Sequence, residues 1–332
     1  KYKLYDIQPE LYYSVLEQLS AMGVLSVTLS GGEPMMNPHF VEFLRAAKKY
    51  DFYVNILSNL TLLNDDIVAA MKEGNVSSVQ VSLYSMNPAH HDAITKLPGS
   101  FEKTKAAILK LIENDLPLHV SCPTMKANKD DYLGVLQWCN EHKIRAQTDY
   151  IMMAEYNHET ENLAHRLSVE EAGRVITSIM EADEAYKESI LAPDFEEKIN
   201  NLQLNPERRL CGVGVSTCCM VANGNVYPCA GWQEMVLGNV NQTPLKEIWD
   251  NSEKIKWLRT LKLKDMGEGE CCKCDKAAFC SPCMVRNANE SPTGNPLEIN
   301  RHFCAVADKN KRIVLAWRKA KLKELSAVAG IR

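Results

Sequence analysis

Short runs of apolar residues alternate, along the first half of the chain, with longer segments whose apolar positions recur at helical spacing. The first helical segment covers about residues 8–22, with Pro9 in its first turn, and Gly23 ends it. The run over residues 24–29 that follows is rich in β-branched residues and predicts a buried strand. The chain therefore opens with a helix followed by a strand.

The same cycle of helix and strand then repeats. Helices are predicted over residues 38–49, 65–73, 101–113, 131–142 and 169–186, and strands over residues 53–57, 78–83, 118–121 and 145–150. Helices and strands that alternate with short connections indicate parallel βα units, in a barrel or an open sheet. In such folds the chemistry lies where the strands end.

The second half of the chain has a different organisation. We read residues 1–190 as the βα domain and residues 191–209, which are polar and lack clear periodicity, as a linker. A cysteine-rich domain is predicted over residues 210–306, and a basic amphipathic helix over residues 307–332 closes the chain.

Composition narrows the functional class. With 45% hydrophobic residues, the 332-residue chain can bury one large core or two smaller ones, and its net charge of −4 gives no electrostatic attraction to nucleic acid or an anionic membrane. We therefore expect no nucleic-acid partner. We also expect no membrane partner, since no apolar run approaches the roughly twenty residues that cross a bilayer. Twelve cysteines without a secretory signal indicate a reducing compartment, so we expect a cytoplasmic protein.

Ten of the twelve cysteines lie between Cys211 and Cys304, and the first 121 residues contain none. Disulfides are typical of small secreted domains, which this chain does not resemble. Structural zinc fits the pairs Cys271/Cys274 and Cys280/Cys283 but gives the remaining cysteines no role. Two iron–sulfur clusters take eight thiolates, which the string can supply, so clusters are the favoured interpretation and zinc is the alternative.

A glycine motif, Gly31-Gly32-Glu33-Pro34, stands at the exit of the first predicted strand. Two glycines let the backbone approach a ligand closely, and the carboxylate of Glu33 can accept from an ammonium group. The alternative is a tight turn with a solvated glutamate, because short glycine motifs are weak signals.

Together, Ser30-Gly-Gly-Glu-Pro34 after a strand, the βα cycles and the cysteine string resemble the radical S-adenosylmethionine superfamily, and its SPASM subgroup in particular. The resemblance implies a partial (β/α)6 barrel followed by a SPASM domain with two auxiliary 4Fe–4S clusters. Members bind the catalytic cluster through Cys-x3-Cys-x2-Cys after the first barrel strand. This chain has no such triad, so we expect the first strand and the cluster loop to be missing from it.

The resemblance also implies roles for individual residues. The methionyl end of S-adenosylmethionine would lie against Gly31, Gly32, Glu33 and Pro34, and its ribose near Asn59 and Ser82. The nearer auxiliary cluster would be bound by Cys211, Cys229, Cys283 and either Cys218 or Cys219, with Cys218 favoured. Strand alternation sends the last two side chains to opposite faces, so we expect only one of them to reach the cluster. The farther cluster would be bound by Cys271, Cys274, Cys280 and Cys304. The spacing of Cys280 and Cys283 is one residue shorter than the commonest form of the family.

The subgroup mostly modifies peptides and proteins. The resemblance therefore implies an enzyme that uses S-adenosylmethionine and 4Fe–4S clusters to generate a 5′-deoxyadenosyl radical. The radical would act on a ribosomally made precursor peptide, to form a thioether or carbon–carbon crosslink or to invert a stereocentre. A flavodoxin or ferredoxin would supply electrons. A sulfatase-type protein maturase and a non-catalytic iron–sulfur or zinc protein are the alternatives.

Overall fold

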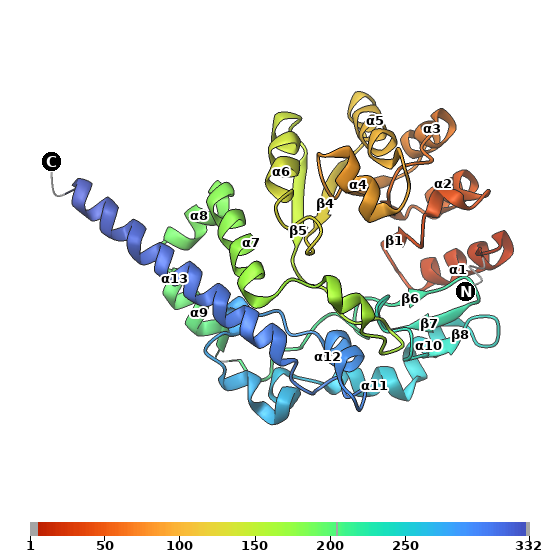
Figure 1. Ribbon diagram of the computed structural model, residues 1–332. Coiled ribbons are helices and arrows are strands. Elements are labelled where there is room, and N and C mark those ends of the chain that lie inside the picture. Colours follow the sequence, from red (N-terminus) through yellow and green to blue (C-terminus); the bar gives the residue numbers. More distant parts are fainter. Residues whose placement is uncertain (1–5, 204, 330–332) are drawn as a thin grey trace. The chain divides into compact units, whose positions relative to one another are not determined.

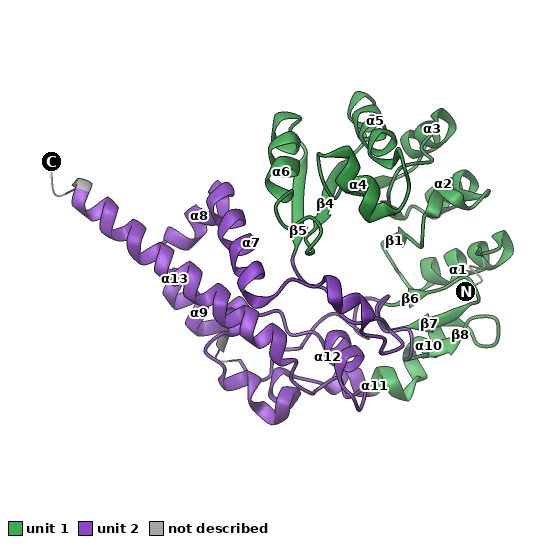
Figure 2. Ribbon diagram, in the orientation of Figure 1, with its two compact units in different colours: residues 1–149, 218–228, 235–256 green, residues 150–217, 229–234, 257–332 purple. Residues whose placement is uncertain are grey.

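The chain forms two compact units in a computed structural model that describes residues 6–203 and 205–329. Unit 1 comprises residues 1–149, 218–228 and 235–256, and unit 2 comprises residues 150–217, 229–234 and 257–332 (Figure 2). The units differ from the predicted division, because the helices after residue 150 group with the C-terminal helix and part of the cysteine-rich region groups with the βα repeats. The extremities of the first and last predicted domains, residues 1–5 and 330–332, lie outside the described residues.

Unit 1 is built around a parallel five-stranded sheet in sequential order (Figure 1). Its strands are β1 (Ser26–Leu29), β2 (Tyr53–Ser58), β3 (Val76–Ser82), β4 (Leu118–Pro123) and β5 (Arg145–Asp149). Because every neighbouring pair is parallel, all five carboxyl ends lie along one edge of the sheet. The predicted α/β class with parallel βα units is confirmed.

Helices alternate with the strands of this sheet along the chain. They are α1 (Pro9–Ala21), α2 (Phe40–Lys49), α3 (Asp65–Glu73), α4 (Pro88–Thr95), α5 (Ser100–Glu113) and α6 (Tyr132–Glu141). In β3, Val79 and Val81 are fully buried while Gln80 between them is only partly buried, which is the alternation expected of a sheet with one covered face. All the predicted helices of this unit are present, whereas α4 was not predicted.

A small antiparallel sheet belongs to the same unit. It contains β6 (Cys219–Met220), β7 (Asn225–Tyr227) and β8 (Gly238–Asn239), and α10 (Leu245–Asn251) follows it. Val226, Leu245 and Ile248 form a buried cluster with Leu19 and Met22 from the end of α1. The side chain of Gln18 also accepts a hydrogen bond from the amide of Leu245 at 2.6 Å, which ties this hairpin region to the first helix.

Unit 2 is mostly helical. Its helices and 3-10 turns are η2 (Glu161–His165), α7 (Val169–Ala182), α8 (Glu184–Leu191), α9 (Phe195–Gln203), η3 (Leu263–Gly269), η4 (Cys271–Lys273), η5 (Ala277–Phe279), α12 (Met284–Glu290) and α13 (Arg301–Ala329), while α11 (Glu253–Thr260) crosses from unit 1 into unit 2. The helix predicted over residues 169–186 breaks at Asp183, whose side chain caps α8 by accepting from the amide of Tyr186 at 2.9 Å.

The segment predicted as a linker, residues 191–209, contains the helix α9. Its Phe195 packs against a buried cluster of Met180, Ile190 and Val314, so α9 is held by tertiary contacts with α7, α8 and α13. With so few apolar positions in this stretch, sequence periodicity alone gave no helical signal. Residues 195–203 of this segment are therefore a packed helix of unit 2 rather than a linker.

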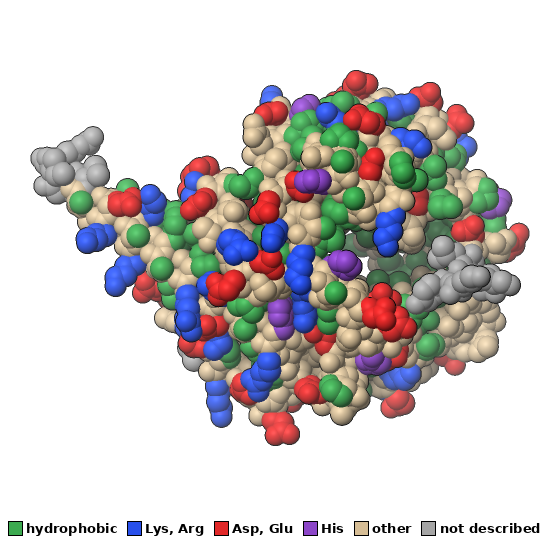
Figure 3. Space-filling model, in the orientation of Figure 1, with side chains coloured by type: hydrophobic (Ala, Val, Ile, Leu, Met, Phe, Trp, Pro, Cys, Tyr) green, Lys and Arg blue, Asp and Glu red, His purple; other side chains and the backbone are tan. Residues whose placement is uncertain are grey.

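The C-terminal basic helix is longer than predicted, since α13 begins at Arg301. Ile313 packs against the clusters on α7, as expected of the apolar stripe. On the face shown in Figure 3, the Lys and Arg side chains are interspersed with Asp and Glu rather than gathered into one basic surface. No helix in the described part of the chain is long and apolar enough to span a membrane.

Candidate cofactor-binding sites

The glycine motif forms a sharp bend at the carboxyl end of β1. Gly31 has φ +149°, a backbone conformation that residues other than glycine rarely adopt. A Cβ atom added to Gly31 or Gly32 would meet nothing within 4 Å, so both glycines border open space. Pro34 then begins the 3-10 turn η1 (Pro34–Met36). The bend therefore offers exposed backbone and room for a bound group, as the predicted cofactor site requires.

Glu33 is held by the protein on several sides. Its Oε1 accepts from the hydroxyl of Ser58 at 2.8 Å and from the amide of Met35 at 3.1 Å, and its Oε2 accepts from the amide of Asn59 at 2.9 Å. A carboxylate has about four lone-pair sites, so roughly one remains for a ligand. Glu33 thus joins the end of β1 to the end of β2, a structural role that neither sequence interpretation of this residue included.

Asn59 and Ser82 lie on the same edge of the sheet. The Oδ1 of Asn59 accepts from the amide of Thr61 at 2.9 Å, and its carbonyl oxygen accepts from Thr104 at 2.7 Å. Ser82 follows Val81, which is paired with the last residue of β2. The structure therefore brings the predicted S-adenosylmethionine residues to neighbouring strand ends, and their individual roles stay predictions.

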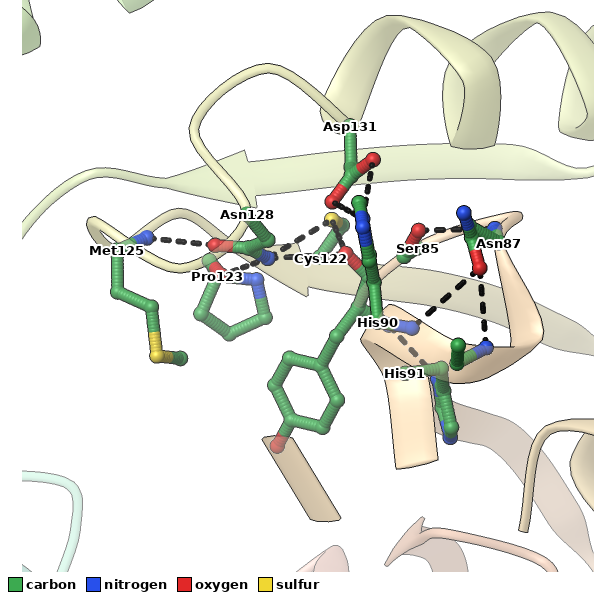
Figure 4. Close-up of polar contacts among 11 residues, drawn as sticks. Ser85, Asn87, His90, His91, Cys122, Pro123, Met125, Asn128 and Asp131 are labelled. Carbon is green, nitrogen blue, oxygen red and sulfur yellow. Dashed lines mark hydrogen bonds and ion pairs between the residues drawn. The ribbon is translucent and has the colours of Figure 1, made fainter. Parts of the chain in front are cut away.

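Sequence reasoning missed a buried asparagine that joins the ends of β3 and β4 (Figure 4). Asn128 donates through Nδ2 to the carbonyl oxygens of Tyr84 at 2.9 Å and Pro123 at 3.0 Å, and its Oδ1 accepts from the amide of Met125 at 2.8 Å. Only 1% of Asn128 is exposed. An asparagine shortly after a strand is a turn signal, which fits its contacts with Pro123 and Met125, but Tyr84 is 44 residues away and no local pattern predicts that contact.

Two of the cysteines lie in this buried region of unit 1. Cys122 is fully buried beside Asn128, and burial raises the pKa of its thiol to about 12. Burial likewise raises the pKa of Cys139 to about 11. Both are therefore protonated thiols at neutral pH.

The helix α4 carries His90, His91 and Asp92. His90 faces Asp131 at 3.1 Å, and His91 is buried with its Nδ1 accepting from the amide of Tyr84 at 3.3 Å (Figure 4). Asp92 accepts from the amides of Gly99 at 2.6 Å and Phe101 at 2.9 Å, and these bonds lower its pKa. These contacts fix the connection between α4 and α5.

Polar side chains line the side of the sheet opposite the buried valines. His119 on β4 contacts Ser78 through Nδ1 at 3.0 Å and Gln80 through Nε2 at 3.1 Å, and Gln147 on β5 donates to the same Gln80 oxygen at 3.5 Å. Because that oxygen only accepts, Nε2 of His119 carries the proton and Ser78 donates to Nδ1. Burial, together with the nearby Arg145, lowers the pKa of His119, so this imidazole is neutral at pH 7. Alternating polar residues in the predicted strands were the available signal for this face.

In unit 2, the farther set of cysteines stands on successive tight turns. The amide of Cys274 bonds to the carbonyl of Cys271 at 3.4 Å, and Cys280 follows the turn η5. Desolvation, followed by the neighbouring Cys304, Cys280 and Cys274, raises the pKa of Cys271 to about 12. The four thiols therefore lie within electrostatic reach of one another, as a shared metal centre requires.

Three cysteines of the nearer set belong to unit 2, whereas Cys218 belongs to unit 1. Desolvation raises the pKa of Cys211, with smaller effects from Cys283 and Cys229, so these three share one region of unit 2. Cys218 belongs to unit 1, where desolvation and the adjacent Cys219 raise its pKa to about 11. The choice of the fourth ligand stays a prediction.

Single-ion and cluster centres place different geometric demands on their cysteine ligands. Within residues 6–203 and 205–329, no group of three or more His, Cys, Asp or Glu side chains is arranged around a point that could hold one metal ion. Each cysteine of a 4Fe–4S cluster binds a different iron, so its four thiolates stand farther apart than the ligands of zinc. Soft thiolates also match iron–sulfur chemistry.

Sequence profiles support the same reading. The profile of the Radical SAM superfamily matches residues 1–139, and that of SPASM, an iron–sulfur cluster-binding domain, matches residues 211–276. The chain carries a radical SAM domain and a SPASM domain. It is an enzyme of the SPASM-containing kind, and S-adenosylmethionine and iron–sulfur clusters are its cofactors.

Individual relatives of this radical SAM enzyme are distant. The AdoMet-dependent heme synthase of Methanosarcina barkeri is 24% identical over 298 residues, covering 85% of this chain and 83% of the relative. The PqqA peptide cyclase of Gluconobacter oxydans is also 24% identical, over 264 residues, covering 77% of this chain and 72% of the relative. The solved structure of anSMEcpe with bound AdoMet has a TM-score of 0.69 at 16% identity and covers 98% of this chain and 93% of that one, which shows a common fold.

Proposed function

We propose that this enzyme modifies a ribosomally made precursor peptide, installing a thioether or carbon–carbon crosslink or inverting a stereocentre. The observation that carries the proposal is the joint match to the radical SAM and SPASM domains, together with a relative that is a peptide cyclase. S-adenosylmethionine held at a reduced 4Fe–4S cluster supplies, in this superfamily, the 5′-deoxyadenosyl radical that abstracts hydrogen.

The chain's own residues would bind and orient the reactants. Gly31 and Gly32 present backbone to the amino-acid end of the cofactor, and Glu33 offers its remaining lone pair to the ammonium group. Asn59 and Ser82 lie at the two next strand ends, where they would contact the ribose. The eight cysteines of the string would hold two auxiliary clusters.

The polar side of the sheet supplies groups suited to a peptide. Gln80 uses its carbonyl oxygen to accept from His119 and Gln147, which leaves its amide N–H groups to donate to a substrate carbonyl. Arg145 adds a positive charge beside them. Such a surface suits the main-chain amides of a peptide better than it suits an apolar ligand. An apolar ligand would leave these polar groups buried without hydrogen-bond partners, which is costly.

A second candidate is a small-molecule reaction of the heme-synthesis type, favoured by the heme synthase relative that covers 85% of this chain. A sulfatase-type protein maturase and a non-catalytic iron–sulfur or zinc protein remain the further alternatives. We also propose a flavodoxin or ferredoxin as electron donor, and a cytoplasmic location.

The test uses the full-length protein, purified and reconstituted anaerobically with iron and sulfide. It is incubated with S-adenosylmethionine, a chemical reductant and synthetic peptides copied from the short reading frames that flank its gene. We expect 5′-deoxyadenosine together with a peptide that has lost two hydrogen atoms or has taken up solvent deuterium at one α-carbon.

The alternatives give different results. Formation of 5′-deoxyadenosine with a porphyrin substrate, and with none of the peptides, would favour the heme-type reaction. Conversion of a cysteine or serine to an aldehyde would favour the sulfatase-type maturase. Bound clusters without any cleavage of S-adenosylmethionine would refute the catalytic proposal.

A further inference from the structure

A buried arginine lies between two segments of the farther cysteine set. Arg286 is 7% exposed, and its guanidinium stacks at 4.2 Å from the centre of the Phe303 ring. It also donates to the carbonyl oxygen of Ser281. Ser281 directly follows Cys280 and Phe303 directly precedes Cys304, so the positive charge is held beside both ligand segments.

This charge lacks an acidic partner. In the part of the chain that the structure describes, no Asp or Glu forms an ion pair with Arg286, although the nearby Arg166 is paired with Glu290 at 2.8 Å. A buried cation without a counter-charge is strongly unfavourable. A negatively charged group bound beside Arg286 would supply the compensating charge.

A second arginine has an unused donor at the same place. The Nε of Arg208 is buried and has no hydrogen-bond partner among the described residues. The backbone of Arg208 is fixed, since its carbonyl accepts from the amide of Leu263 at 2.8 Å. Leu263 begins η3, and η3 packs against η4, the turn that begins at Cys271, so Arg208 is anchored beside a segment of the same cysteine set.

We infer that Arg208 and Arg286 are the charge and hydrogen-bond partners of an iron–sulfur cluster bound by Cys271, Cys274, Cys280 and Cys304. The inference rests on the ligand set proposed above. A 4Fe–4S cluster with four thiolates is an anion that gains a further negative charge on reduction, and its sulfur atoms accept N–H bonds. The two arginines therefore favour the reduced cluster and raise its reduction potential.

The test is a redox titration of the anaerobically reconstituted full-length protein, followed by electron paramagnetic resonance. The relevant signal is the one that does not respond to S-adenosylmethionine and that persists when Cys211 and Cys229 are replaced by alanine. We expect Arg208→Gln and Arg286→Gln to move its midpoint potential to more negative values with the iron content unchanged.

Two further variants separate charge from hydrogen bonding and test specificity. Arg208→Lys keeps the charge but removes the Nε donor, so its shift should be smaller than that of Arg208→Gln. Arg312→Gln is the matched control, because Arg312 is exposed and already paired with Asp308 at 2.8 Å, and its potential should equal that of the wild type.

An unchanged potential in both glutamine variants, with full iron content, would overturn the inference. If Arg286→Gln loses iron, Arg208→Gln at its more exposed site decides the matter. A wild-type protein that holds this cluster but does not cleave S-adenosylmethionine would refute the proposed function and leave the inference standing. A wild-type protein without a signal that depends on Cys271 would refute the inference itself.

Discussion

Replacing Asn128 by alanine should loosen the edge of the sheet where the proposed substrate and cofactor meet the strand ends. The variant loses three hydrogen bonds, at 2.8, 2.9 and 3.0 Å, in a site that is 99% buried. Each bond contributes about 1 kcal/mol net, and the Pro123 carbonyl and the Met125 amide would lose their side-chain partner, while the Tyr84 carbonyl would keep only the thiol of Cys122 at 3.6 Å. The free energy of unfolding should therefore fall by about 3–5 kcal/mol.

An aspartate at the same position gives a second signature. Its oxygens would face two carbonyl oxygens, so the buried site favours the neutral acid and raises the pKa of the introduced carboxyl above about 4. Since the unfolded state then releases its proton first, stability falls as pH rises through about 4. Asn128→Asp should thus be most stable in acid, relative to the wild type.

The assay is amide hydrogen exchange of the region from β4 to α6, with urea unfolding as the global measure. Asn140→Ala is the matched control, because Asn140 is exposed on α6 and its loss should change stability by no more than about 0.5 kcal/mol. Equal protection of this region in Asn128→Ala and Asn140→Ala would refute the bracing role assigned to Asn128.

Three further predictions concern the sites. Glu33→Gln should weaken binding of S-adenosylmethionine, measured by isothermal calorimetry. An amide nitrogen would replace one of the two carboxylate oxygens that join the end of β1 to the end of β2, and unchanged affinity would contradict this. Cys271→Ala should lose about four irons per chain whereas Cys272→Ala should lose none, as measured by iron analysis. The pKa of Asp92 is lowered from 3.8 in the folded protein. The contribution of its carboxylate to the free energy of unfolding is therefore present above pH 3.8 and is lost as the pH falls through the folded pKa. Asp92→Asn should accordingly flatten the acid side of a curve of stability against pH.

The parallel βα architecture could be predicted from sequence because its signals are local. Each strand is a short β-rich run and each helix has an apolar stripe, so element boundaries differ from the predicted ones by a few residues. The glycine bend was equally readable, since the left-handed φ of Gly31 requires glycine.

What escaped prediction depends on partners that are distant in the chain. The helix α9 is held by Phe195 against residues of three other helices, and Asn128 finds its acceptors 44 and 5 residues away. Glu33 was read as a ligand group or a solvated turn, but it braces β2 through Ser58 and Asn59. The family resemblance likewise implies which thiols converge, but it carries no signal for the arginines in that region.

The path of the backbone between the two units constrains how this protein can be taken apart. The chain passes from one unit to the other after residues 149, 217, 228, 234 and 256. A chimera that exchanges only the cysteine-rich region would strip α1 of Val226, Leu245 and Ile248 and uncover its apolar end. The boundaries of an exchanged module should therefore follow the packing of the chain rather than its sequence order. The small sheet β6–β8 and α10 then stay with α1, whose apolar end they cover.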